Sequence, residues 1–90
     1  PSYLKKQETG VNLTKLKNIV SQAVTSSDYA NNIVIIKTLQ GMAQGVAYAV
    51  ENLHLTSILG SIAGDDTIMI VLRNEKQAEE LSVKIAEYIR

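Results

Sequence analysis

The chain of 90 residues contains no cysteine, no tryptophan and no phenylalanine, and only one proline and four tyrosines. The absence of cysteine excludes a disulfide framework and a thiolate metal site. With so few aromatic residues the core must be aliphatic, built from the isoleucine, valine and leucine that make up most of the 46% hydrophobic residues. We expect one small domain, which is marginally stable alone because a chain this short buries only about 60–65% of its unfolded surface.

An excess of charge and long hydrophobic runs are missing as well. The formal net charge is zero, which argues against binding of nucleic acid through a broad basic surface. No segment approaches the roughly 18 apolar residues that a membrane-spanning helix needs, and no signal peptide is visible. The sequence therefore predicts a cytoplasmic protein without a membrane partner.

The first half of the chain predicts a linker, a helix and a strand. Residues 1–10 are rich in charged and structure-breaking residues and are expected to be a linker, followed by one domain over residues 11–90. Apolar residues at helical spacing follow Asn12, a candidate N-cap, and Ser26–Asp28 are expected to end that helix. Residues 33–39 are apolar on both faces, which predicts a strand covered on both faces.

The second half predicts a helix over residues 42–53, strands over 58–63 and 67–72, and a last helix that Asn74 and Gln77 open as a capping box. The predicted order is α-β-α-β-β-α. The fold class is α/β (α+β): a two-layer sandwich with a mostly antiparallel sheet and helices on one face. Because the strands keep an apolar second face, we expect the chain to associate with copies of itself.

Two adjacent carboxylates, Asp65 and Asp66, lie in the turn between the last two predicted strands. One interpretation is a solvated turn, since aspartate tolerates turn conformations and bonds to nearby amides. The other is a cation site, for which a guanidinium is well suited because its planar fork of donors pairs with carboxylates. A metal ion has less support, because no third acid or histidine lies nearby in the sequence. From these residues alone both interpretations stay open.

Motifs of catalysis are missing from the sequence. The chain has one histidine, His54, and neither a G-x-S-x-G elbow nor a phosphate-binding loop. We therefore predict no enzyme activity, no metal and no cofactor.

Residues 38–53 (TLQGMAQGVAYAVENL) and 58–72 (ILGSIAGDDTIMIVL) resemble the C-terminal domain of bacterial arginine repressors, and the similarity extends from about residue 12 to residue 90. The most specific element is GSIAGDDT, residues 60–67, which is similar to the family's G-T-I-A-G-D-D-T motif with serine in place of threonine. The sequence departs from the family at Gln40, where proline is usual, and at His54, where glycine commonly follows leucine.

The resemblance implies an effector-binding and hexamerisation domain of an arginine-responsive transcriptional regulator that controls genes of arginine biosynthesis and catabolism. Such domains form trimers, two trimers stack into a hexamer, and L-arginine binds at the trimer–trimer interface as corepressor. We assign Asp65 to the guanidinium and Asp66 to the α-ammonium, and the reverse assignment stays open. The implied ligand-binding residues are Gln44, Asp65 and Asp66, with Gly41, Met42, Ala63 and Thr67 as backbone or secondary contacts.

Two other functions are weighed against this one. The first is a purely structural oligomerisation module that binds no ligand. The second is an enzyme acting on arginine, which the missing nucleophile and acid–base partner argue against. Calorimetry with L-arginine separates binding from a structural role, and a turnover assay separates both from an enzyme.

Chains of the resembling family also carry an N-terminal winged helix-turn-helix that binds operator DNA, and that module lies outside these 90 residues. Because the chain is neutral and has no helix with clustered basic residues, we expect no specific operator binding by these residues alone. An electrophoretic mobility shift assay at physiological salt checks this expectation. A shifted band that survives competitor DNA would contradict it.

Overall fold

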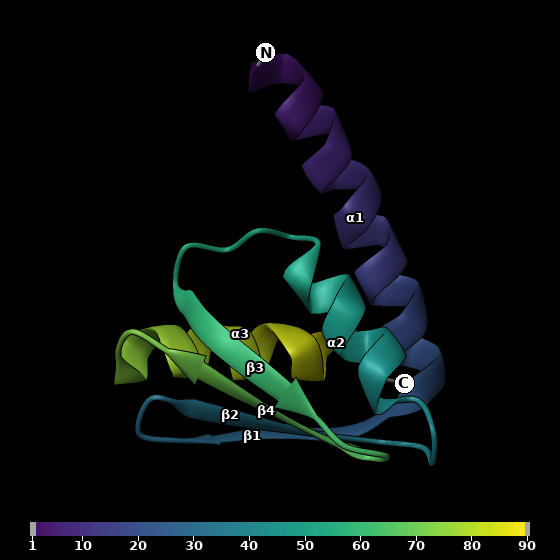
Figure 1. Cartoon of the computed structure of the whole chain (residues 1–90), viewed down its shortest axis with the longest axis vertical. Coiled ribbons are helices and arrows are strands. Elements are labelled where there is room, and N and C mark those ends of the chain that lie inside the picture. Colours follow the sequence, from purple (N-terminus) through teal and green to yellow (C-terminus); the bar gives the residue numbers. More distant parts are fainter. Residues whose placement is uncertain (1, 90) are drawn as a thin grey trace.

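The computed structural model describes the backbone of residues 2–89 and the side chains of residues 11–89. Its elements follow in the order α1 (Ser2–Ala23), β1 (Val24–Ala30), β2 (Ile33–Thr38), α2 (Ala43–Glu51), β3 (Ile58–Ala63), β4 (Thr67–Leu72) and α3 (Glu75–Tyr88). The strands form one antiparallel sheet in the order β1-β2-β4-β3, and the helices lie on one of its faces (Figure 1). The predicted fold class, an α+β two-layer sandwich, is confirmed.

The predicted order α-β-α-β-β-α is wrong by one strand, β1. This segment, VTSSDYA, is polar and was expected to end the first helix, but it pairs antiparallel with β2 at the edge of the sheet. Side chains on its inner face bond to α3: the Ser27 hydroxyl donates to the carbonyl of Ser82 at 3.2 Å, and the Tyr29 hydroxyl donates to Glu79 at 3.1 Å. The bond to Glu79 raises the pKa of Tyr29. Because these partners are distant in sequence, no local apolar pattern indicates the strand.

Helix α1 begins at Ser2 and continues through Gly10 without a break. Asn12 therefore lies inside the helix, and the prediction that it is the N-cap is wrong. Its carboxamide instead donates to the carbonyl of Asn52 at 2.8 Å, which ties α1 to the end of α2. In Figure 1 the N-terminal half of α1 projects beyond the sheet and the other helices. The division into a linker over residues 1–10 and a domain over residues 11–90 stays a prediction.

The core lies between the helices and the inner face of the sheet. Along β2 and β4 every second side chain is buried. Because these strands are apolar on both faces, their sequence did not indicate which face would lie under the helices. Full burial of one such aliphatic side chain contributes about 1.5–3 kcal/mol relative to leaving it exposed. The fully buried strand residues are Val34, Ile36, Ile68, Ile70 and Leu72, which pack with Leu16 and Val20 of α1, Val46 and Val50 of α2, and Ile85 of α3.

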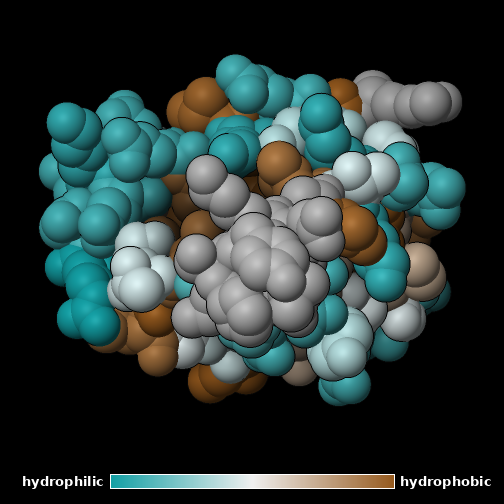
Figure 2. All heavy atoms as spheres, turned by 90° about the horizontal axis from the view of Figure 1, so that it is seen from above, coloured by the Kyte–Doolittle hydropathy of each residue, from teal (hydrophilic) through white to brown (hydrophobic). Residues whose placement is uncertain are grey.

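The second face of the sheet, here called the outer sheet face, carries Ile33, Ile35, Ile62, Met69 and Val71. The strand register places these residues side by side, on the face opposite the helices. Ile62 is 75% exposed and Met69 is 43% exposed. The sequence predicted strands covered on both faces. Within one chain, however, no described segment covers the outer sheet face. The end of the molecule from which α1 projects differs, because hydrophobic residues are scattered there among hydrophilic ones (Figure 2).

Of the two hydrogen bonds in the capping box predicted at the start of the last helix, one is present. The Asn74 side chain accepts a hydrogen bond from the backbone of Gln77 at 2.9 Å, as an N-cap does. The side-chain oxygen of Gln77 is buried without a partner, so the reciprocal bond of a capping box is missing. Among residues 2–89 there is also no helix with the length and apolar character to cross a membrane.

Helix α2 is followed by a strained residue that yields a stability prediction. His54 has a φ of +53° and is exposed, a conformation that costs a residue with a Cβ atom about 1–2 kcal/mol. His54→Gly should raise the free energy of unfolding by about 0.5–1 kcal/mol, since the greater chain entropy of unfolded glycine offsets part of the gain. Chemical denaturation at one protein concentration measures it. His54→Ala is the matched control, because it removes the imidazole but keeps the strain; an equal gain in both variants would contradict the explanation.

Candidate functional site

Two turns meet at one end of the sheet, the turn between β3 and β4 and the turn between β2 and α2. The main-chain carbonyl of Asp65 accepts hydrogen bonds from the N–H groups of Gly41 at 3.0 Å and Ala43 at 3.3 Å. The carbonyl of Asp66 accepts from the N–H of Thr38 at 2.7 Å. Gly41 has a φ of +80°, which glycine adopts without strain. These bonds fix the Asp65–Asp66 pair beside the first turn of α2.

The backbone of this turn, rather than its carboxylates, supplies most of the structural contacts. Asp65 and Asp66 are both exposed, and no hydrogen bond or ion pair of the Asp65 carboxylate is present among the described residues. Asp66 accepts a bond from the Thr67 hydroxyl at 3.0 Å, and that hydroxyl accepts one from Lys37 at 3.1 Å. The turn thus holds its shape without the Asp65 side chain, whose acceptors are available to a cation.

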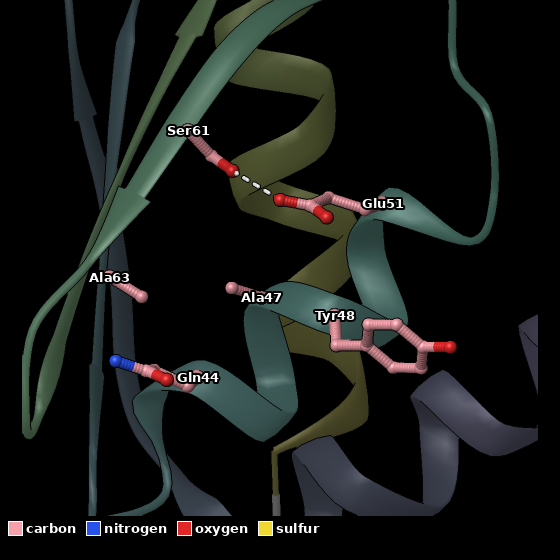
Figure 3. A pocket seen from close by; sticks show the side chains of 6 residues that line it. All are labelled: Gln44, Ala47, Tyr48, Glu51, Ser61 and Ala63. Carbon is pink, nitrogen blue, oxygen red and sulfur yellow. Dashed lines mark hydrogen bonds between the residues drawn. The ribbon is translucent and has the colours of Figure 1, made fainter.

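A pocket of about 300 Å³ opens between α2 and β3, next to these turns (Figure 3). This volume is at the lower end of the range for small-molecule sites. Across the pocket the Ser61 hydroxyl donates a hydrogen bond to the Glu51 carboxylate at 3.2 Å. The Gln44 side chain points toward Ala63, whereas the Tyr48 ring points away from β3 (Figure 3). The lining residues are Gln44, Ala47, Tyr48 and Glu51 from α2, and Ser61 and Ala63 from β3.

The predicted ligand residues lie close together in the fold but not in one pocket. Gln44 and Ala63 line the pocket. Asp65 and Asp66 form the adjoining turn, with Thr67 at its end as a hydrogen-bond partner of Asp66. The N–H groups of Gly41 and Met42 are already bonded, to the carbonyls of Asp65 and Leu39 respectively. Contact of any of these residues with a ligand stays a prediction.

Sequence reasoning missed three polar pocket residues, Tyr48, Glu51 and Ser61. Tyr48 and Glu51 lie four and seven positions after Gln44, which is the spacing of one helix face. Ser61 lies two positions before Ala63 and therefore on the same side of β3. Periodicity thus identifies both faces, but only the tertiary structure brings them together. Among residues 11–89 no group of three or more histidine, cysteine, aspartate or glutamate side chains is placed to hold a metal ion.

The family model and the relatives that match the chain indicate the same family. The family model described as the arginine repressor C-terminal domain matches residues 20–87. The arginine repressor of Acetivibrio thermocellus is 49% identical over 73 residues, which cover 81% of this chain and 48% of that protein. That of Ruminiclostridium cellulolyticum is 50% identical over 76 residues, covering 84% and 51%. That of Carboxydothermus hydrogenoformans is 39% identical over 84 residues, covering 93% and 56%. The chain spans about half the length of the relatives that it matches.

Proposed function

The chain belongs to the arginine repressor family, whose C-terminal domain it matches over residues 20–87, and we propose that it binds L-arginine and assembles into trimers that stack as a hexamer. In the whole protein this domain serves a transcriptional regulator of arginine genes, with operator DNA bound by a separate N-terminal domain. The observation that carries the proposal is the exposed Asp65–Asp66 pair held beside Gln44 and the α2–β3 pocket.

The chemistry of these residues suits arginine. The ligand has a guanidinium at one end and an α-ammonium at the other, and two carboxylates neutralise both cations. Asp65, which has no partner in the described chain, takes the guanidinium in our assignment, and Asp66 takes the α-ammonium. The Gln44 amide and the Glu51 carboxylate add polar groups on the neighbouring wall of the pocket. A hydrogen bond to a charged group contributes about 1.5–3 kcal/mol.

Self-association is supported by the outer sheet face. A contiguous apolar surface of this kind usually marks a contact with another protein, and no segment of the described chain covers Ile62 or Met69. In the proposed hexamer the Asp65–Asp66 pairs of several chains lie near one interface, where like charges repel until cations neutralise them. A ligand that binds the hexamer in preference to free trimers stabilises it by mass action. L-Arginine then controls assembly, and through it the presentation of the DNA-binding domains.

The two alternative functions have less support. A module without a ligand assigns no role to the α2–β3 pocket or to the Asp65 carboxylate, which has no partner in the part of the chain that the structure describes. An enzyme acting on arginine needs a nucleophile or an acid–base pair. The relatives described above are named arginine repressors, which favours a regulator over an enzyme.

The state of assembly tests the role of the outer sheet face. We expect trimers or hexamers in solution, shifted toward hexamers by L-arginine, in sedimentation velocity or light scattering. Met69→Lys places a charge on this face and should weaken self-association at least tenfold, or about 1.4 kcal/mol. Val83→Lys is the matched control, because Val83 is 51% exposed but lies on α3. A wild-type chain that is monomeric at micromolar concentration, with and without arginine, would contradict the proposal.

The acidic pair is tested by Asp65→Asn and Asp66→Asn. Asparagine is equally suited to the turn, and the main-chain bonds that hold the turn are retained. If the carboxylates bind arginine, each variant loses a charged acceptor, at roughly 2–5 kcal/mol for a buried pair. Calorimetry should give at least tenfold weaker arginine binding in both, while Glu87→Gln on α3 binds normally. Assembly without ligand should be retained or strengthened. Wild-type affinity in both variants would leave the pair as a turn only.

L-Citrulline, nearly the shape of arginine but uncharged at its end, decides which aspartate binds the guanidinium. The wild-type chain should bind it roughly tenfold to a hundredfold more weakly than arginine. Asp65→Asn should lose this preference and Asp66→Asn should keep it. The opposite pattern would exchange the two roles, and equal binding of both ligands by the wild-type chain would refute a carboxylate contact with the guanidinium.

A further inference from the structure

A second hollow, of about 210 Å³, lies between α1 and α2. We call it the α1–α2 hollow. Tyr48 lines both this hollow and the α2–β3 pocket, and its ring points away from Ser61 and Ala63 (Figure 3). The opposite wall belongs to α1, and Tyr48 is the one lining residue that this hollow shares with the α2–β3 pocket. It therefore needs a separate explanation.

One side of the α1–α2 hollow is apolar and is kept open by a glycine. Ile19, Gly45 and Ala49 form this side. A Cβ atom on Gly45 would lie 3.4 Å from the Cδ1 atom of Ile19. An alanine would fit there only by narrowing the hollow. Glycine in a helix interior costs about 1 kcal/mol relative to alanine. The glycine therefore leaves this space open at a cost to the stability of α2.

The polar groups of the hollow are those of Asn12, Lys15, Tyr48 and Asn52. The Asn12 carboxamide donates to the main-chain carbonyl of Asn52, which anchors the two helices at this point. No ion pair of Lys15 and no hydrogen bond of the Tyr48 or Asn52 side chains is present among the described residues. Among residues 11–89 no acidic side chain lines the hollow. The polar side that the described residues form thus offers one positive charge together with neutral amide and hydroxyl groups.

We propose that the α1–α2 hollow binds a small monocarboxylate with a short aliphatic body. The carboxylate pairs with the Lys15 ammonium and accepts hydrogen bonds from Tyr48 and Asn52, while the aliphatic part lies on Ile19 and Ala49. The volume of about 210 Å³ suits only a small ligand. A cationic ligand such as arginine is disfavoured there by Lys15. The proposal adds a site to the one assigned to arginine and does not depend on it.

The test uses 3-methylbutanoate as the probe, because it is small and has a carboxylate and a branched aliphatic body. In the 90-residue chain labelled at isoleucine δ1-methyl groups, the Ile19 resonance is assigned by its loss in Ile19→Val. This resonance should shift saturably on titration, and that of Ile62 on the outer sheet face should not. The uncharged 3-methylbutanamide should bind at least tenfold more weakly, and 3-methylbutylamine should not bind. An Ile19 resonance that does not move, or equal responses to all three probes, would overturn the proposal.

Two variants separate the site from general effects. Lys15→Gln removes the charge, and Gly45→Ala narrows the hollow while favouring the helix, so its thermal midpoint should hold or rise. Both should bind 3-methylbutanoate at least tenfold more weakly, whereas Lys76→Gln on α3 should bind it normally. Unchanged binding in both hollow variants, or displacement of the probe by L-arginine, would refute the site. Arginine affinity measured in the same variants keeps the two proposals apart, since loss of arginine binding alone bears only on the proposed function.

Discussion

The antiparallel pairing of β2 with β4 in the middle of the sheet is the constraint on which the rest of the structure depends. Its register sets Val34 opposite Ile70 and Ile36 opposite Ile68, and all of these side chains are fully buried under the helices. The same register sets Ile35 opposite Met69 on the outer sheet face. Because side chains alternate along a strand, a slip of one residue would exchange the two faces. The core and the apolar outer surface are therefore consequences of one register.

The candidate site depends on the same pairing. The β2–β4 register ends with Lys37 opposite Thr67. Beyond that pair the two segments stay side by side, because the Thr38 N–H donates to the Asp66 carbonyl. The acidic turn is thereby held against the start of α2. Since main-chain groups do this work, the turn interpretation and the cation interpretation of the aspartates are compatible. The backbone makes the turn, and among the described residues the Asp65 carboxylate has no hydrogen-bond or ion-pair partner.

Helix α2 is short, and it meets different neighbours on its different sides. Val46 and Val50 face the core, Gln44 and Glu51 face the pocket beside β3, and Gly45 with Ala49 faces α1. Few of its side chains are large, which leaves room for a hollow on either side of Tyr48. A ligand in either hollow contacts the same rigid element. Any coupling between them would be reciprocal, as linkage requires.

Much of this structure was determined by the sequence itself, because burial imposes a period on local residues. The apolar and β-branched residues of 33–39 and 67–72 specified two strands but not which face would be buried, Asn74 specified a helix start, and GSIAGDDT identified the family. Only the tertiary structure decided the rest. Strand β1 is polar and is held by hydrogen bonds to β2 and α3. Helix α1 includes the segment that precedes Gly10, although that segment has no apolar period. The pocket that adds Glu51 and Ser61 to the candidate site exists because α2 and β3 pack together, and contacts between segments distant in the chain leave no local pattern to read.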